Sequence, residues 1–267
     1  MHNAHAHCDF TLPALTHAPR SMILFVAMEG EAAPIAKQLA LGNASAMIHG
    51  QPMMVREGVV AGAQLRLITP GRDQHTHTDR VGLVYAATTL AAALTIARAD
   101  LVVNAGTAGG FESGGVAIGD LVIARTVSVH DARVALPGFD VLARGHTRLS
   151  PSDSSLRAMA QELSAHIGAV SSGSSLDSTS DERELFTREH IRAKDMELAA
   201  LAMVARDWGV ALAALKGITD LVDRSEPIHT SFLRNLARAS EHVASAIGPF
   251  IETLAHTHVQ HDAAHSA

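Results

Sequence analysis

The sequence has little cysteine and few aromatic residues. Cys8 is the only cysteine among 267 residues, so no disulfide can form within the chain. Phe, Trp and Tyr together make up 3% of the residues, whereas 47% are hydrophobic. A substantial core is therefore expected, and it must consist mainly of Ala, Leu, Val and Ile. These residues are typical of parallel sheets that are covered by helices.

Basic clusters and long apolar runs are also missing. The formal net charge is -6, and no basic cluster alternates with aromatic residues, which argues against a nucleic-acid partner. No run of about 18 apolar residues occurs, so no membrane span is predicted. The N-terminus has no charged start followed by an unbroken apolar segment, so we expect no secretory signal. These absences predict a soluble, cytoplasmic protein.

Histidines concentrate at the two ends of the chain. Four lie in residues 1–20 and four in residues 255–267, but their spacing fits no established pattern of metal ligands. We therefore predict no metal site there. The ends are interpreted as a flexible extension over residues 1–20 and a flexible tail over residues 255–267, on either side of one domain formed by residues 21–254.

Strand-like and helical patterns alternate within this domain. The strand-like runs are Met22–Met28, Gln64–Thr69, Asp100–Ala105, Leu121–Val129, Ile167–Ser171 and Val210–Gly217. The helical stretches are Glu31–Leu41, Val81–Arg98, Ser155–His166, Glu197–Asp207 and Thr230–Leu254. Such alternation predicts an α/β fold, in which helices cover both faces of a mostly parallel or mixed central sheet in a three-layer sandwich.

Three acidic residues come at or just past the ends of strand-like runs. Glu31 and Asp220 follow apolar runs, and Glu197 follows a more polar one. Ligands of open α/β sheets bind beyond the carboxyl ends of the strands, so the three carboxylates could converge on one small molecule. This points to an enzyme. Asp220 could instead cap a helix, and Glu31 and Glu197 could be first-turn residues that match a helix dipole.

A glycine-rich segment, 101-LVVNAGTAGGF-111, follows one of the strands. It does not complete a dinucleotide-binding fingerprint, because the residues after it form a predicted loop rather than a helix. Two interpretations remain from this segment alone. It is a tight turn without a ligand, or its backbone lines a nucleoside pocket.

Six segments occur in the order seen in a known family. They are 27-AMEGEAAPI-35, 69-TPGRD-73, 103-VNAGTAGGF-111, 118-IGDLVIARTVSVHDARV-134, 194-KDMELAALA-202 and 216-KGITDLVD-223. Over residues 22–254 the sequence resembles the methylthioadenosine/S-adenosylhomocysteine nucleosidases of the nucleoside phosphorylase superfamily, most closely the plant-type enzymes. The resemblance implies a nucleoside phosphorylase-like fold and a homodimer. It also implies hydrolysis of the N-glycosidic bond of 5′-methylthioadenosine without a metal or organic cofactor, and it leaves S-adenosylhomocysteine open as a second substrate.

The resemblance also implies roles for individual residues. Asp220 is the general acid at the departing adenine, and Glu31 holds and activates the attacking water. Glu197 binds the ribose hydroxyls while Met196 packs against the sugar. The further substrate-binding positions that the resemblance implies are Thr107, Ala108 and Gly109 along the glycine-rich segment, Leu176 at the base, and Lys194 and Asp195 in the pocket wall.

Two alternatives stay open at this stage. A purine nucleoside phosphorylase would need cations for phosphate, but Asn104 stands where such relatives carry an arginine, and Glu31 would repel the dianion. Arg72 would weaken this argument if it reached the site, although it could instead pair with Asp73. A non-catalytic nucleoside-binding protein is the second alternative, because Leu198 and Ser174 depart from the family pattern.

The pair His130–Asp131 resembles another family feature. We interpret the pair as structural or interfacial rather than catalytic, since histidine has many such roles.

Overall fold

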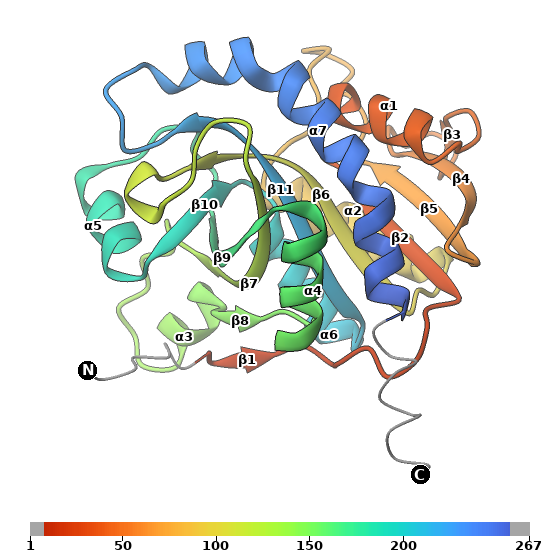
Figure 1. Ribbon diagram of the computed structural model, residues 1–267, viewed down its shortest axis with the longest axis horizontal. Coiled ribbons are helices and arrows are strands. Elements are labelled where there is room, and N and C mark those ends of the chain that lie inside the picture. The colour runs from red at the N-terminus through yellow and green to blue at the C-terminus, as the bar shows by residue number, and fades with distance from the viewer. Residues whose placement is uncertain (1–7, 257–267) are drawn as a thin grey trace.

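The computed structural model describes residues 8–256, which form one α/β domain around a mixed sheet (Figure 1). Its strands are β1 (Phe10–Thr11), β2 (Ser21–Phe25), β3 (Ser45–Ala46), β4 (Met54–Val60), β5 (Ala63–Thr69), β6 (Leu101–Gly110), β7 (Leu121–Val129), β8 (Thr147–Arg148), β9 (His166–Ser172), β10 (Ile191–Asp195) and β11 (Ala211–Leu221). Its helices are α1 (Glu29–Gln38), α2 (Leu83–Ile96), α3 (Phe139–Arg144), α4 (Asp153–Leu163), α5 (Ser180–Arg188), α6 (Leu198–Trp208) and α7 (Ile228–His256), with a 3₁₀ turn at Glu112–Gly114.

Part of the sheet closes on itself. β6 pairs in parallel with β11, β11 pairs antiparallel with β7, and β7 pairs in parallel with β9. β9 then pairs in parallel with β10, and the end of β10 returns antiparallel to the end of β6. From β6 the sheet extends outward through β2, β5, β4 and β3. The predicted mixed central sheet is confirmed, but the sequence did not indicate the closed ring of five strands.

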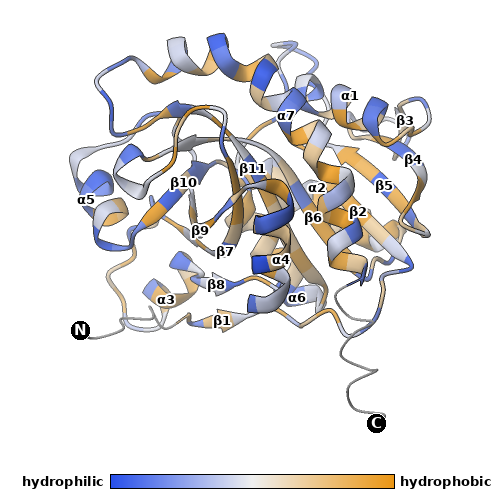
Figure 2. Ribbon diagram, viewed as in Figure 1, coloured by the Kyte–Doolittle hydropathy of each residue, from blue (hydrophilic) through white to orange (hydrophobic). Residues whose placement is uncertain are grey.

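Helices cover both faces of the sheet, and the sequence explains why. Along β2, Met22 and Leu24 point to a core shared with α1, α4 and α7, whereas Ile23 and Phe25 point to a core shared with α2 and α6. Successive side chains of a strand face opposite sides, so a strand buried on both faces must be apolar throughout. Figure 2 shows the central strands as a largely hydrophobic layer. The three predicted layers are present.

The predicted strands and helices are found with shifted ends, and one interpretation is wrong. The glycine-rich segment is not a turn after a strand that ends at Ala105, because β6 continues through Gly110. This part of β6 pairs with β11 on one side and with β10 on the other. Gly106 lies opposite Lys216 of β11, and Gly109 lies opposite Lys194 of β10.

The predicted N-terminal extension needs a correction for residues 8–20. Phe10 pairs with Thr147 of β8, and the side chains of Leu12 and Leu15 are buried. The guanidinium of Arg206 lies 4.3 Å from the centre of the Phe10 ring. Apolar burial therefore fixes this segment to the domain. At the other end, α7 continues to His256, and the rest of the predicted tail lies outside the described residues. Within residues 8–256, no helix is long and apolar enough to cross a membrane.

Candidate active site

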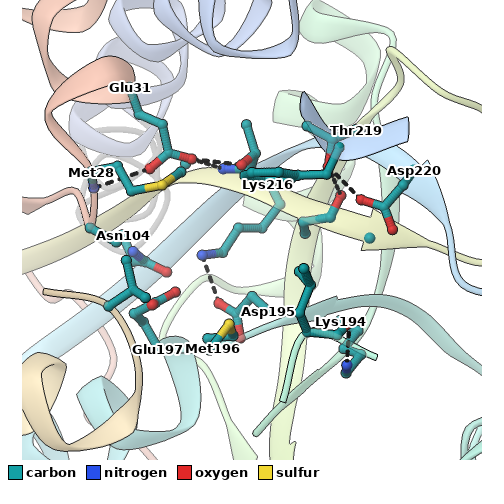
Figure 3. A pocket seen from close by; sticks show the side chains of 18 of the residues that line it. Met28, Glu31, Asn104, Lys194, Asp195, Met196, Glu197, Lys216, Thr219 and Asp220 are labelled. Atoms are coloured by element: carbon teal, nitrogen blue, oxygen red, sulfur yellow. Dashed lines mark hydrogen bonds and ion pairs between the residues drawn. The ribbon is translucent and has the colours of Figure 1, made fainter. Parts of the chain in front are cut away.

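The carboxyl ends of β2, β6, β10 and β11 surround a pocket of about 310 Å³ (Figure 3). This volume is at the lower end of the range that is usual for small-molecule sites. The structure brings all ten site residues expected from the sequence to its wall: Glu31, Thr107, Ala108, Gly109, Leu176, Lys194, Asp195, Met196, Glu197 and Asp220. The other lining residues include Met28, Val81, Asn104, Ser175, Lys216, Thr219, Val222 and Phe232.

Asp220 lies within β11, and an irregularity in the strand positions it. Ile218 pairs with Ala108 and Asp220 with Gly109, so Thr219 is an extra residue on β11. Bulges of this kind redirect side chains near active sites. The Thr219 hydroxyl donates to Oδ1 of Asp220 over 2.7 Å. The alternative role as a helix cap is therefore wrong.

The environment of Asp220 makes its carboxyl hold a proton more tightly than an exposed aspartate does. Burial raises the pKa of its carboxyl, although the hydrogen bond from Thr219 and the charge of Lys194 oppose that rise. Gly109 makes room for the carboxylate, because a Cβ there would lie 2.8 Å from Oδ2. Oδ1 is occupied by the hydroxyl of Thr219, so Oδ2 is the oxygen that is left for a ligand.

Glu31 is the third residue of α1 and is held by three donors. Oε1 accepts hydrogen bonds from the backbone N–H of Thr107 (2.6 Å) and from its hydroxyl (2.7 Å), while Oε2 accepts one from the N–H of Met28 (3.3 Å). Glu31 therefore lies in the first turn of α1, as one alternative predicted, and it also lines the pocket. Burial raises the pKa of this carboxyl, whereas the Thr107 donors and the charge of Lys216 lower it.

Glu197 stands at the N-cap position of α6, yet its side chain does not cap that helix. Oε1 instead accepts a hydrogen bond of 2.9 Å from the N–H of Gly82, the N-cap residue of α2. Burial, followed by the negative charge of Asp195, raises the pKa of Glu197 to about 7, against the opposing charge of Lys216. Protonated and ionised forms of Glu197 are therefore close in free energy near neutral pH.

Lys216 is a site residue that the sequence analysis missed. It is fully buried in β11, and its ammonium lies 2.7 Å from Oδ2 of Asp195. Asp195 also accepts hydrogen bonds from the Ser172 hydroxyl and from the N–H of Leu198 at the start of α6. A lysine inside the apolar run 211-ALAALKGIT-219 was the available signal, because a buried lysine needs a partner.

Asn104 presents a free acceptor to the pocket. Its Nδ2 donates to the carbonyl of Phe25 over 3.3 Å, which fixes the orientation of the amide. Its Oδ1 is buried and has no hydrogen-bond partner among the described residues. An acceptor buried without a partner is costly, so this oxygen is suited to a donor on a bound molecule.

Several residues that the sequence analysis left undecided lie outside the pocket. Arg72 is mostly exposed and lies 3.5 Å from Asp79, while Asp73 accepts from the N–H groups of His75 and Thr76 in its own loop. Arg72 therefore pairs neither with Asp73 nor with the site. Leu198 is buried in the core between α6 and the sheet, so it does not narrow the cavity.

Ser174 lies in the loop between β9 and α5, which borders the pocket, and the pair His130–Asp131 follows β7 and contacts that region. Asp131 accepts a 2.8 Å hydrogen bond from the N–H of Ser174. His130 is buried, its Nδ1 lies 3.1 Å from the Ser171 hydroxyl, and its ring packs edge-on against Phe186. These contacts fit the structural interpretation of the pair. Across residues 8–256, no group of three or more His, Cys, Asp or Glu side chains is arranged to hold a metal ion.

Comparison with known proteins finds related sequences and a related fold. A model of the phosphorylase superfamily matches residues 21–252. A 5′-methylthioadenosine nucleosidase of Arabidopsis thaliana is 34% identical over 81% of this chain and 80% of its own length. A 5′-methylthioadenosine/S-adenosylhomocysteine nucleosidase from the same plant is 32% identical over 88% and 92%. The solved apo structure of an Arabidopsis thaliana 5′-methylthioadenosine nucleosidase superposes with a TM-score of 0.82, at 31% identity, over 88% of this chain and 95% of that one.

The fold and the buried acidic pocket thus define a member of the phosphorylase superfamily. Within it, the chain belongs to the family of 5′-methylthioadenosine nucleosidases.

Proposed function

We propose that this N-glycosidase hydrolyses 5′-methylthioadenosine to adenine and methylthioribose, with Asp220 as acid, Glu31 as the residue that activates water, and Glu197 at the ribose. The observation that carries this proposal is that Glu31, Glu197 and Asp220, three buried carboxyl groups with different surroundings, line one pocket beside the lysine-paired Asp195. Figure 3 shows Glu31 and Asp220 on opposite sides of that pocket. An acid and a water-holding base on opposite sides of the sugar are the arrangement of inverting glycoside hydrolysis.

Asp220 supplies the proton that the departing adenine needs. Negative charge grows on the base as the N-glycosidic bond breaks, and protonation or hydrogen bonding at N7 neutralises it. The acid must therefore carry a proton at neutral pH. Its raised pKa supports this role, and Oδ2 is available for it because Thr219 binds Oδ1.

Glu31 orients the nucleophilic water. Two donors from Thr107 and one from Met28 fix the carboxylate and favour its ionised form. An ionised Glu31 can accept a proton from water as the water attacks the anomeric carbon. That carbon becomes cationic in an oxocarbenium-like transition state, and the acidic surroundings stabilise the positive charge.

Glu197 and Met196 bind the sugar. The Gly82 N–H holds one carboxylate oxygen of Glu197 and leaves the other for the ribose 2′- and 3′-hydroxyls. The thioether of Met196 lines the same wall and packs against the ribose. Leu176 lines the pocket as the apolar contact for the base. The backbone of Thr107, Ala108 and Gly109 lies alongside the nucleoside.

The charges of the pocket support water rather than phosphate as the nucleophile. No arginine lines the pocket in the described part of the chain, and Arg72 is paired with Asp79. The two lysines present are engaged, Lys216 with Asp195 and Lys194 with backbone carbonyls. A phosphate dianion would meet carboxylates without a free cationic clamp.

We further propose that the protein is a cytoplasmic homodimer. S-adenosylhomocysteine is a second candidate substrate, because the 32% identical relative is a 5′-methylthioadenosine/S-adenosylhomocysteine nucleosidase. Exposed apolar side chains cluster in and before α3, where Leu136, Phe139 and Leu142 are 59%, 63% and 52% exposed. Clusters of this kind are typical of protein–protein contacts. A neighbouring subunit could then help to close the pocket around the 5′-thio group.

The test is the isosteric variant Asp220→Asn. Loss of the proton donor should lower kcat for adenine release by about 10²–10⁴-fold while the protein still binds the nucleoside, because general acid catalysis contributes about that much. Asp207→Asn, an exposed substitution near the end of α6, serves as the control and should keep full activity. Wild-type turnover in Asp220→Asn would contradict the assignment of the acid.

A further inference from the structure

The loop of residues 173–179 connects β9 to α5 and forms one wall of the pocket. Ser175 and Leu176 line the cavity, but the side chain of Leu176 is 45% exposed and is not packed in the hydrophobic core. Apolar burial therefore cannot account for the conformation of this loop. Polar contacts must hold it in place.

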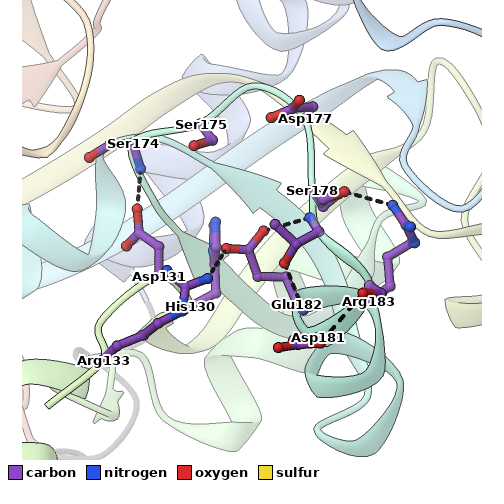
Figure 4. A network of polar contacts seen from close by, with 12 residues as sticks. His130, Asp131, Arg133, Ser174, Ser175, Asp177, Ser178, Asp181, Glu182 and Arg183 are labelled. Carbon is purple, nitrogen blue, oxygen red and sulfur yellow. Dashed lines mark hydrogen bonds and ion pairs between the residues drawn. The ribbon is translucent and has the colours of Figure 1, made fainter.

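Both ends of the loop are fixed by side chains (Figure 4). At its start, Asp131 accepts from the N–H of Ser174 over 2.8 Å. At its end, Arg183 donates to the carbonyl of Ser178 over 2.6 Å, and Thr179 and Glu182 form a capping box at the start of α5. These contacts do not reach the three middle residues, Ser175 to Asp177, so another group must hold them.

Lys194 of β10 holds that middle part. Its ammonium donates to three consecutive carbonyls, those of Ser175 (2.7 Å), Leu176 (3.0 Å) and Asp177. The residue is 5% exposed. An ammonium has three N–H donors, so all three are used by the loop and the contact requires the charged form. Lys194 therefore has no donor left for a nucleoside, even though it lines the pocket.

We propose that Lys194 is a positioning residue. Its ammonium draws three carbonyls of the loop together and so fixes the position of the loop against which the purine packs. This inference rests on the proposed nucleosidase function. The carbonyl dipoles of Ser175, Leu176 and Asp177 converge and repel one another unless a cation sits between them. Without that cation, the loop would turn these carbonyls towards water and carry Leu176 away from the base.

The test is the variant Lys194→Met, which keeps a long apolar stem but removes the charge and the donors. We expect KM for 5′-methylthioadenosine and Kd for free adenine to rise at least tenfold, with kcat within about threefold of wild type. Lys194→Gln retains two N–H donors and should give intermediate values. It also provides the comparison if Lys194→Met does not fold. Lys37→Met, an exposed lysine of α1, is the matched control and should leave both constants unchanged.

Three outcomes would overturn the proposal. Unchanged KM and adenine Kd in both Lys194 variants, with only a lower Tm, would make the contact merely structural. A large fall in kcat at constant KM would make Lys194 part of the chemistry. Equal effects of Lys194→Gln and Lys194→Met would exclude the carbonyl contacts as the cause. Because adenine binding is measured without turnover, these results remain distinct from a failure of the proposed reaction.

Discussion

Single carboxyl groups in this pocket differ in the donors that reach them, and those donors oppose the rise in pKa that burial causes. Three donors contact Glu31, while one hydroxyl contacts Asp220 and one N–H contacts Glu197. All three are buried, and burial alone disfavours the charged form. More donors therefore favour the ionised form at Glu31 than at the other two groups, which suits a residue that must be ionised to activate water.

The Thr107 hydroxyl should influence the pH dependence of the reaction. It lowers the pKa of Glu31, so Thr107→Val should raise that pKa. Glu31 must be ionised to accept a proton, and activity is lost as the pH falls through its pKa. The acidic limb of the profile of kcat/KM against pH should therefore move to higher pH in Thr107→Val. An unmoved acidic limb would show that Glu31 does not set it.

Glu197 should make the free protein less stable at neutral than at mildly acidic pH. Its pKa rises from an ordinary value of 4.5 to about 7 on folding, so the folded state binds the proton more tightly than the unfolded chain. The free energy of unfolding should then fall between about pH 4.5 and 7, on the order of 3 kcal/mol from this group at most.

Thermal unfolding measured across that pH range checks this prediction. Glu197→Gln should reduce the slope of Tm against pH, while Glu241→Gln, on the exposed face of α7, should leave it unchanged. Glu31 and Asp220 have raised pKa values as well, so the slope should decrease without vanishing. A slope that stays the same in Glu197→Gln would contradict the account of its burial.

At the scale of elements, the strands buried on both faces were predictable and the half-exposed ones were not. β2, β7 and β11 are largely apolar and mostly buried. β4 contains Arg56, Glu57 and Gly58, and α5 is mostly polar, so neither gave a recognisable pattern. The end of β6 was misjudged because its glycines suggested a turn. Pairing with both neighbouring strands, which no local pattern reveals, keeps Gly106 to Gly110 extended.

The close approach of β6 and β11 should make Gly109 intolerant of any side chain. A Cβ there would lie 2.8 Å from Oδ2 of Asp220 and 2.7 Å from a methyl group of Val222. Gly109→Ala should therefore displace the acid and lower kcat at least tenfold. Gly248→Ala in α7 is the control, because the nearest atom to its Cβ is 3.8 Å away. That change should leave kcat intact and stabilise the fold by about 0.5–1 kcal/mol. Full activity in Gly109→Ala would contradict the importance of this contact.

At the scale of the whole molecule, the closed ring of strands brings distant segments to one pocket. The ring joins the end of β6 to the ends of β10 and β11, and so gathers Thr107, Glu197 and Asp220. The sequence predicted which residues would meet because ordered motifs resemble a family. It could not predict that Lys216 lies among the carboxyl groups, since that depends on how the strands close.

Assembly is a second property at this scale. If the exposed apolar cluster of α3 joins two subunits, the double variant Phe139→Ser, Leu142→Ser should be monomeric in analytical ultracentrifugation, whereas the wild type should be dimeric. The monomer should keep its fold, because both side chains are more than half exposed. A wild type that is monomeric at micromolar concentration would overturn the proposed dimer.

The most direct test of the central claim is product analysis with 5′-methylthioadenosine in buffer with and without phosphate. Hydrolysis predicts adenine and free methylthioribose in equal amounts, at a rate that does not depend on phosphate. Formation of a sugar phosphate, or adenine release only when phosphate is present, would contradict the account. It would mean that Lys216 or another cation of the chain binds the anion despite the carboxylates around it.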